Sequence, residues 1–306
     1  MANETIMEMP LVSVFLITYN SAETVVEALE SVKAQTYKNI ELIVSDDASK
    51  DDTVRIVREW VDKNKDRFTD VKVITAQKNG GIAPNCNRAV KASSGKWLKV
   101  LAGDDQLKPE AIEEYLNFMN KHPEADIAFA KLEMFGVNPQ ECAILKSQYE
   151  ENLYPKIRLS QPQQYMEDLW SLFVPGPGLF FSRKLFDEIG GYDERYPMCE
   201  EHPFTSYTLH NKHHIKFIDK ELYRYRISEH SYCRQEKTLS VHEKDKQRFF
   251  IDWKLPLLEK YGQGPQARHK ASKSYFSFPK NERTLGKTLK FRFTYFFDSI
   301  LLKLKK

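Results

Sequence analysis

The chain has 306 residues, of which 41% are hydrophobic and 29% are charged, which suits one large globular domain or a domain with an appendage. Its formal net charge of +3 is too small to indicate a nucleic-acid-binding protein. The four cysteines, Cys86, Cys142, Cys199 and Cys233, form no CxxC pair, which disfavours a structural zinc site. Free thiols in a reducing compartment are therefore expected.

The first part of the chain alternates strand patterns with amphipathic helix patterns. Residues 11–20 and 40–49 begin with β-branched and apolar runs that predict buried strands, and a helical pattern follows each. Residues 71–76 predict a third strand. Residues 97–105, WLKVLAGDD, predict a fourth, with one lysine inside the apolar run. Because such alternation is typical of a parallel sheet covered by helices on both faces, the predicted fold class is α/β.

Two helix starts carry local signals. Asn20 is followed by Glu23 at the spacing of a capping box, which predicts a helix start there. Gly80 and Gly81 free the backbone before Pro84, which suits the first turn of another helix.

The second half of the chain is less regular. Residues 126–135 and 214–228 predict strands, whereas residues 163–173 and 199–212 predict helices. Residues 136–159 are polar and aromatic, and a hairpin or loop is expected there.

Two aspartate pairs follow predicted strands, at residues 46–47 and 104–105. Parallel strands end at the same edge of a sheet, where ligands of open α/β sheets bind. Adjacent carboxylates repel each other unless a cation neutralises them, and Mg²⁺ or Mn²⁺ binds through such oxygens together with substrate phosphates. One Asp-Asp pair is common in a solvated turn, but two at one edge favour a cation-binding crevice. No GxGxxG or GxxxxGK[ST] motif occurs, so a dinucleotide Rossmann site or a P-loop is disfavoured.

From about residue 240 the chain becomes amphipathic, and its end mixes Lys and Arg with aromatic and aliphatic residues. Residues 285–306 suit a helix on an anionic membrane surface, or equally a helix packed on the body of the protein. The first residues, MANETIMEMP, lack the apolar core of a signal peptide, and no run reaches the about 20 apolar residues of a membrane span. The expected location is cytoplasmic, with peripheral contact to the inner face of the cell membrane as an open alternative.

Three blocks resemble glycosyltransferase family 2: PLVSVFLITYN, IELIVSDDASKDDT and NGGIAPNCNRAVKASSGKWLKVLAGDD. Downstream, PGPGLFFSRKLFDEIGGYDE resembles the acceptor-side segment of that family, and CEEHPFTSYTLHNKHHIKFI its helix with an acidic pair. The resemblance implies a GT-A fold, with a Rossmann-like, mostly parallel sheet flanked by helices. It divides the chain into a domain over residues 1–239 and a helical C-terminal extension over residues 240–306. The nucleotide-binding half would span about residues 10–120 and the acceptor half about residues 121–239.

The resemblance also implies roles for individual residues. Glu201 would be the general base, and Asp105 would bind the metal, with Asp104 on the ribose or in the metal shell. His230 is a second candidate for a phosphate or metal contact. The other expected donor-binding residues are Thr18, Tyr19, Asn20, Asp47, Asn79 and Arg88, and Gly176, Gly178 and Glu200 would lie on the acceptor side.

The implied reaction moves a sugar from a nucleotide donor, most often a UDP-sugar, to an acceptor hydroxyl. Mn²⁺ or Mg²⁺ would neutralise the leaving diphosphate, and a single displacement would invert the anomeric carbon. The acceptor would be a glycan or a lipid-linked glycan, as in bacterial surface polysaccharide synthesis. No QxxRW motif follows the acidic helix, which argues for one sugar per encounter and against a processive synthase.

Two alternatives remain. The family's usual acidic pair is Glu-Asp, and here it is Glu200-Glu201, so a degenerate protein that binds nucleotide sugar without turnover stays open. A sugar nucleotidyltransferase shares the α/β plan and the acidic metal ligands. It should carry a glycine-rich, basic signature after the first strand, where this chain has TYNSAET.

Overall fold

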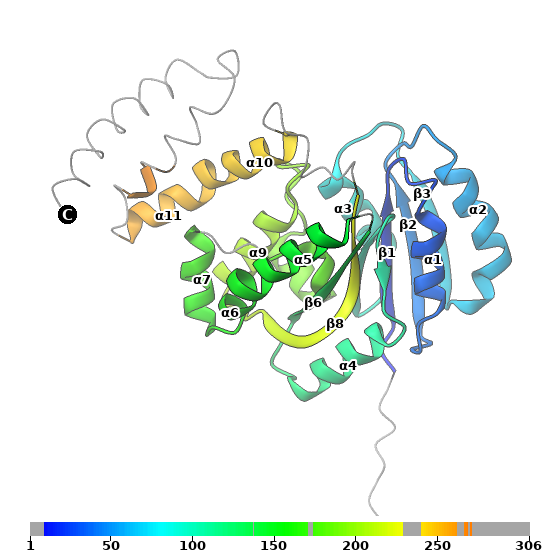
Figure 1. Cartoon of the computed structure of the whole chain (residues 1–306), viewed down its shortest axis with the longest axis horizontal. Coiled ribbons are helices and arrows are strands. Elements are labelled where there is room, and N and C mark those ends of the chain that lie inside the picture. The colour runs from blue at the N-terminus through cyan, green and yellow to red at the C-terminus, as the bar shows by residue number, and fades with distance from the viewer. Residues whose placement is uncertain are drawn as a thin grey trace, which may run out of the picture.

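Figure 1 shows a computed structural model of the chain, with a central sheet, helices on its faces and further helices beyond one end. The structure describes residues 9–136, 138–170, 174–228, 240–261, 266–268 and 270.

The first four long strands form the parallel part of the sheet. They are β1 (Val12–Thr18), β2 (Ile40–Asp46), β3 (Asp70–Thr75) and β4 (Trp97–Ala102). Their spatial order is β3-β2-β1-β4, and every neighbouring pair is parallel. The predicted α/β class is confirmed. All four strands end at one edge, so the turns after β2 and β4 flank the end of β1.

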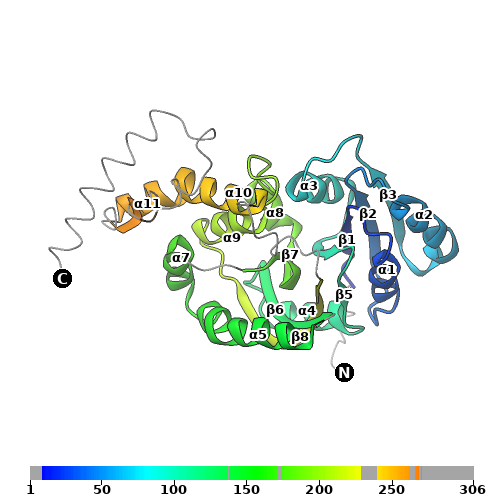
Figure 2. The same ribbon diagram turned by 45° about the horizontal axis from the view of Figure 1, so that its top comes forward.

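Helices cover both faces of this half. They are α1 (Val25–Lys33), α2 (Thr53–Asn64) and α3 (Ile82–Ala92), and Figure 2 shows α3 across the sheet from the other two. Every residue of β2 is buried, as expected for a strand covered on both faces. Pro84 lies in the first turn of α3, as predicted.

The second half of the sheet is mixed. Beyond β4 lie β7 (Leu179–Ser182), β6 (Ile127–Gly136), β8 (Lys216–Ile227) and β5 (Gln106–Leu107), in that order. β5 follows β4 directly in the chain but pairs with β8, at the far end of this order. The sheet therefore curls, and β8 comes close to the turn after β4. The helix α4 (Ala111–Lys121) lies beneath β8 in Figure 1.

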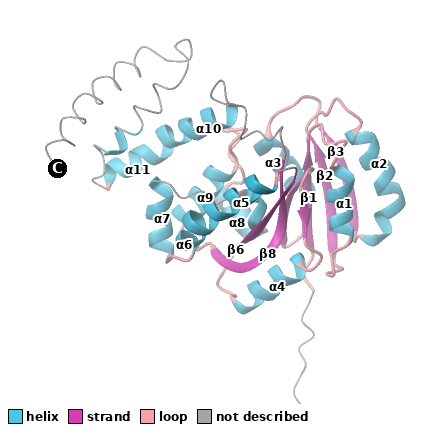
Figure 3. Ribbon diagram, in the orientation of Figure 1, coloured by secondary structure: helices cyan, strands magenta, loops and turns pink. Residues whose placement is uncertain are grey.

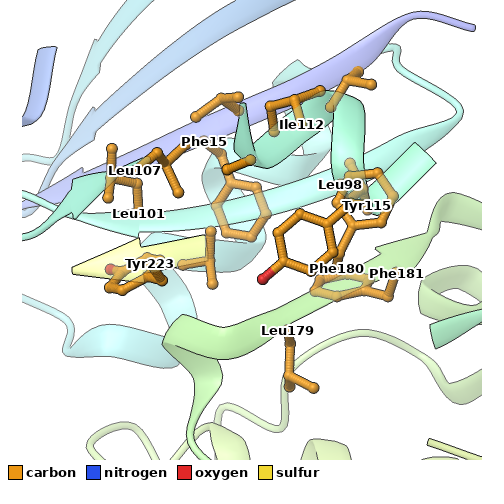
Figure 4. Packing of buried hydrophobic residues seen from close by; sticks show 14 of the residues in the cluster. Phe15, Leu98, Leu101, Leu107, Ile112, Tyr115, Leu179, Phe180, Phe181 and Tyr223 are labelled. Atoms are coloured by element: carbon orange, nitrogen blue, oxygen red, sulfur yellow. The ribbon is translucent and has the colours of Figure 1, made fainter. Parts of the chain in front are cut away.

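The core runs between these layers. Figure 4 shows the ring of Tyr115 from α4 against Phe180 of β7, with centroids 4.8 Å apart, and Tyr223 of β8 near Leu101 and Leu107. Aromatic stacking of this kind fixes α4 and β7 together beside β4.

The prediction of a hairpin or loop over residues 136–159 is wrong. This segment is helical and comprises α5 (Pro139–Gln148), a π-helical turn (Tyr149–Leu153) and α6 (Tyr154–Ile157). The start signal is present in the sequence. The Asn138 side chain accepts hydrogen bonds from the N–H groups of Gln140 and Glu141, and Pro139 occupies the first position of α5.

The predicted capping box at Asn20 is also wrong. Asn20 has a φ of 51°, and its Oδ1 accepts a hydrogen bond of 2.8 Å from the N–H of Lys50. The helix begins later, at Val25. Asn20 therefore ties the turn after β1 to the turn after β2, because Asn tolerates this left-handed conformation.

The remaining helices belong to the second half of the chain and, like every described helix, are cyan in Figure 3. They are α7 (Gln161–Trp170), α8 (Arg183–Ile189), α9 (Glu201–His210), α10 (Val241–Phe249) and α11 (Leu255–Lys260). Phe249 and Leu258 are buried in small clusters with residues from the loop before α9 and from α7. The described start of the C-terminal extension thus packs on the body of the protein. Within the described residues no helix is long and apolar enough to cross a bilayer.

Candidate active site

Asp47 directly follows β2, and backbone amides surround its carboxylate. Its Oδ2 accepts hydrogen bonds from the N–H groups of Gly80 (2.9 Å) and Gly81 (2.8 Å), at the start of α3. Gly81 has a φ of 98°, and a Cβ there would lie 2.8 Å from the carbonyl oxygen of Pro197, so only glycine fits. Asp47 is only 2% exposed.

Arg88 of α3 contacts the other oxygen of the Asp47 carboxylate. Its Nη2 lies 3.3 Å from Asp47 Oδ1 and 2.7 Å from Asn85 Oδ1, and Asn85 in turn donates to the carbonyl of Thr18. The Thr18 carbonyl also accepts the N–H of Asp47 at 2.9 Å. Thr18, Asp47 and Arg88 are therefore joined in one network at the strand edge.

The other expected donor residues lie on the rim of this network. Tyr19 is 44% exposed, directly after β1. Asn20 and Asn79 are exposed as well, and Asn79 precedes the amides that hold Asp47. Their exposure leaves these side chains accessible to a ligand.

The turn of Asp104 and Asp105 is fixed by β8. Asp105 Oδ2 accepts a hydrogen bond of 2.7 Å from the Tyr223 hydroxyl, and Oδ1 accepts one of 2.8 Å from the N–H of Arg226. Asp105 is 2% exposed. Burial, followed by the charge of Asp104, raises its pKa well above the usual value, while its two donors oppose the shift. Each carboxylate oxygen of Asp105 thus has one protein donor, and the two hydrogen bonds tie the turn to β8.

Asp104 is the more open of the two. It is partly exposed, and among the described residues no other side chain donates a hydrogen bond to its carboxylate. Burial raises the pKa of Asp104, whereas its own N–H and the charge of Arg226 oppose the rise. The two carboxylates therefore differ in exposure and in their hydrogen-bond donors, and the expectation that Asp105 binds the metal stays a prediction.

The chemistry of this turn fits a divalent cation completed by substrate. The described residues contain no group of three or more His, Cys, Asp and Glu side chains placed to hold a metal alone. One carboxylate with diphosphate oxygens and water is a common set for Mg²⁺ or Mn²⁺. Asp104 supplies such a carboxylate. The other metal candidate, His230, lies outside the described residues.

Three of the residues expected on the acceptor side, Gly176, Glu200 and Glu201, lie together. A Cβ built on Gly176 would lie 3.6 Å from Glu201 Oε2 and 3.8 Å from Glu200 Oε1, so both carboxylates border this glycine. Oε2 of Glu200 is buried, and no atom of the described residues forms a hydrogen bond with it. A Cβ on Gly178 would lie 2.2 Å from the Phe129 ring, so glycine is required there for packing.

Cys86 of α3 lies between the two halves. Burial raises the pKa of its thiol well above the usual value, and the charges of Glu200 and Glu201 add to the rise. Asp47 also raises this pKa, and Arg88 lowers it. The start of α9 and Asp47 thus both act on this thiol of α3, and the loop before α9 contacts α3 directly, since the Pro197 carbonyl accepts a hydrogen bond of 3.0 Å from the N–H of Ala83.

Sequence reasoning missed two residues of this site. Asn85 lies within NCNR and links Arg88 to β1. The signal available in the sequence was Asn85 itself, a polar residue on the buried face of the predicted helix. Tyr223 meets Asp105 only because β8 curls back to pair with β5. No local pattern reports that pairing.

Comparisons with known proteins agree with this architecture. The model for glycosyl transferase family 2 matches residues 13–190. An uncharacterised glycosyltransferase of Rickettsia prowazekii is 32% identical over 186 residues, which is 60% of this chain and 54% of that protein. The chain thus matches about half the length of that relative.

Two solved structures are similar in fold. TarS of S. aureus, residues 1–349 in complex with UDP-GlcNAc, has a TM-score of 0.59 and 20% identity, over 92% of this chain and 79% of that chain. The mannosyltransferase PcManGT from Pyrobaculum calidifontis, in complex with GDP-Man and Mn²⁺, has a TM-score of 0.56 and 15% identity, over 97% and 86% of the two chains.

The curled sheet, with acidic residues at the ends of β2 and β4, is a glycosyltransferase fold of the GT-A type. The chain belongs to glycosyl transferase family 2. The matched residues include both aspartate turns and end before Glu200 and Glu201.

Proposed function

We propose that this protein is a metal-dependent, inverting and non-processive glycosyltransferase that uses a nucleotide-sugar donor. The observation that carries the proposal is that the loop before α9 contacts α3, the helix that begins beside Asp47. Asp47 and Asp104 follow the ends of β2 and β4, and Glu200 and Glu201 lie at the start of α9, where their charges act on Cys86 of α3. An inverting transfer needs a cation site for the leaving group and a base on the other face of the sugar.

The donor is proposed to bind at the strand edge. Arg88 and the exposed Tyr19, Asn20 and Asn79 would hold the nucleoside, with Asp47 contacting the base. Asp104 would hold the cation. That cation, when bound, neutralises charge on the departing nucleoside diphosphate. Asp105 keeps the turn of Asp104 in place through Tyr223 and Arg226.

Glu201 is proposed as the base, with Glu200 on the acceptor side. Both lie at the start of α9, beside Gly176, where we propose that the acceptor binds. The attacking hydroxyl would give its proton to the Glu201 carboxylate as it bonds to the anomeric carbon. One displacement from the face opposite the leaving group inverts that carbon.

UDP-linked sugars are the proposed donors, and a glycan or lipid-linked glycan of a bacterial surface polysaccharide is the proposed acceptor. One fold neighbour is described with UDP-GlcNAc and another with GDP-Man and Mn²⁺, which supports a nucleotide sugar with a divalent cation. A thermal-shift panel of UDP-, GDP- and dTDP-sugars, each with and without Mn²⁺, tests this. We expect UDP-sugars to raise the melting temperature only when Mn²⁺ is present. Equal stabilisation without metal would contradict the metal dependence.

Turnover needs its own test. Wild-type protein with Mn²⁺ should release UDP from the donor that the panel selects, and NMR should show the product with the opposite anomeric configuration. Donor binding without any release of UDP would favour the non-catalytic alternative.

Peripheral membrane contact through residues 285–306 remains a proposal, and this segment lies outside the described residues. Its basic and aromatic composition supports binding to anionic lipid. Co-sedimentation with vesicles of anionic lipid should be lost when these residues are removed. If the full-length protein does not co-sediment with such vesicles, the proposed membrane contact is wrong.

A further inference from the structure

Lys99 lies in the middle of the buried strand β4. Its residue is 0% exposed, between Leu98 and Val100. An isolated ammonium group in a protein interior is very costly, so a lysine persists there only with specific partners. Lys99 is not part of the donor or base sites described above.

The partners of Lys99 are backbone carbonyls and aromatic rings. Its Nζ donates hydrogen bonds to the carbonyl oxygens of Pro177 and, at 2.9 Å, Leu179. It also lies 4.7 Å from the ring centroid of Tyr223 and 5.4 Å from that of Tyr115. These rings suit a cation, because their faces are negative.

The carbonyls that Lys99 holds lie in the turn of residues 176–178, at Pro177, and at Leu179, the first residue of β7 directly after it. The Tyr115 hydroxyl donates to the carbonyl of Gly178 at 2.9 Å, between the two that Lys99 holds. Lys99 and Tyr115 thus donate hydrogen bonds to three consecutive carbonyl oxygens, those of residues 177–179. The first residue of the turn, Gly176, borders Glu201 and Glu200.

Lys99 is also connected to the aspartate turn. The Tyr223 ring that faces its ammonium carries the hydroxyl that donates to Asp105. The same hydroxyl accepts the N–H of Ala102 at 3.3 Å. Burial lowers the pKa of Lys99 well below its usual value, and the charge of Asp105 opposes this shift. The contacts therefore run from the end of β4, through Lys99, to the glycine that faces the acidic pair.

We propose that Lys99 is a positioning residue that holds the Gly176–Gly178 turn in register with the Asp104–Asp105 turn. It would set the distance between the donor phosphates and the acceptor beside Glu201. This inference rests on the proposed function. Displacement of a reacting group by about 1 Å can cost about 100-fold in rate, so an amine distant from the chemistry can control kcat.

The test compares Lys99→Met with the control Lys96→Met. Methionine retains the apolar stem of Lys99 and removes its hydrogen-bond donors, whereas Lys96 is exposed and one residue before β4. The probes are Mn²⁺ with UDP for binding, UDP-GlcNAc with water as acceptor for turnover, and hydrogen exchange of residues 174–182 for the turn.

For Lys99→Met we expect kcat to fall about 100-fold, while KM for UDP-GlcNAc and the Kd of UDP with Mn²⁺ stay within about threefold. Exchange of residues 174–182 should accelerate, with β1 unchanged, and Lys96→Met should match wild type in every readout. A parallel loss of kcat and UDP affinity, or unchanged exchange in the turn, would overturn the proposal.

Tyr115→Phe and Tyr223→Phe provide an independent route if Lys99→Met does not fold. Tyr115→Phe removes only the bond to Gly178, and should give the same pattern with about a tenfold fall in kcat. Tyr223→Phe retains the ring over Lys99, so exchange of the turn should stay unchanged. Faster exchange in Tyr223→Phe but not in Tyr115→Phe would contradict the assignment. If wild type releases no UDP, the proposed function fails, and the exchange data alone decide whether Lys99 holds the turn.

Discussion

The hydroxyl of Tyr223 donates a hydrogen bond of 2.7 Å to the carboxylate of Asp105, and so joins β8 to the turn that ends β4. The other Asp105 oxygen accepts the N–H of Arg226. Adjacent aspartates in one sequence motif thus have different environments. Asp105 joins the turn to β8, and the partly exposed Asp104 carboxylate is the one that we propose for the cation.

Asp104→Asn should abolish the effect of Mn²⁺ on UDP binding, because an amide is a weaker ligand for a hard cation than a carboxylate. The variant should remain folded, since no described side chain depends on this carboxylate for a hydrogen bond. Calorimetric titration of UDP with and without Mn²⁺ measures the change. A variant whose UDP affinity still rises normally with Mn²⁺ would return the metal to Asp105 or to another residue.

Asp105→Ala should lower stability by about 2–4 kcal/mol, because Tyr223 and the N–H of Arg226 each lose a buried acceptor. Urea unfolding measures this. Asp104→Asn, the matched change one residue earlier, should stay within about 1 kcal/mol of wild type. Equal losses in the two variants would show that their roles are not divided in this way.

The fold was largely predictable, because each buried strand of the first half is an apolar run of its own and helices alternate with the strands. The aspartate turns were predictable for the same reason, since strand ends in a parallel sheet share an edge. The division between Asp104 and Asp105 was not predictable. It depends on β8, more than 100 residues later in the chain, at a register set by the pairing of Gln106 with Arg224.

In the less regular regions, local sequence patterns predicted two features wrongly, the segment of α5 and the cap at Asn20. Asn138 and Pro139 start α5, yet the polar composition of the segment suggested a loop. Asn20 and Glu23 suggested a cap, but the side chain of Asn20 bonds to Lys50 in a neighbouring turn. A tertiary hydrogen bond displaced the local one, which periodicity alone cannot reveal.

Glu201→Gln should lower kcat by about 10²–10⁴-fold and leave the Kd of UDP with Mn²⁺ unchanged, because it removes a proton acceptor and retains the shape. Glu200→Gln is the matched control one residue earlier, and should cost less than about tenfold. UDP release and a separate binding titration distinguish the two effects. A larger loss in Glu200→Gln would assign the base to Glu200.

Arg88→Ala should weaken UDP binding by about tenfold, because Asp47 loses its cation and the nucleoside pocket loses a donor. The control Arg55→Ala removes an arginine from exposed pairs on α2 and should have no effect on UDP. Calorimetric titration of both variants with UDP in the presence of Mn²⁺ measures the Kd. If both variants bind UDP like wild type, the nucleoside does not lie against Asp47 and Arg88.

Cys86 and Cys199 should resist alkylation in the native protein at about pH 8. Burial raises the pKa of both thiols, and the charges of Glu200 and Glu201 add to the rise, so little reactive thiolate forms. In the unfolded chain these thiols have the ordinary cysteine pKa of about 8.5. Above that pH the unfolded chain loses thiol protons that the folded protein keeps, so the free energy of unfolding should fall as pH rises. Mass spectrometry after iodoacetamide, with and without urea, measures the protection. Rapid labelling of either native thiol would contradict its burial.

Lys254→Met should destabilise the protein by about 3–5 kcal/mol, because it leaves the Asp168 carboxylate buried without its cation. Lys254 Nζ lies 3.0 Å from Asp168 Oδ1, and the Ser206 hydroxyl donates to Asp168 Oδ2 at 2.8 Å. This pair connects the segment between α10 and α11 to α7 and α9. The double variant Asp168→Leu/Lys254→Met should recover most of the loss, since both charges are removed. Urea unfolding of the two variants decides. A double variant no more stable than Lys254→Met would show that packing of this segment, rather than charge pairing, holds the start of the C-terminal extension on the fold.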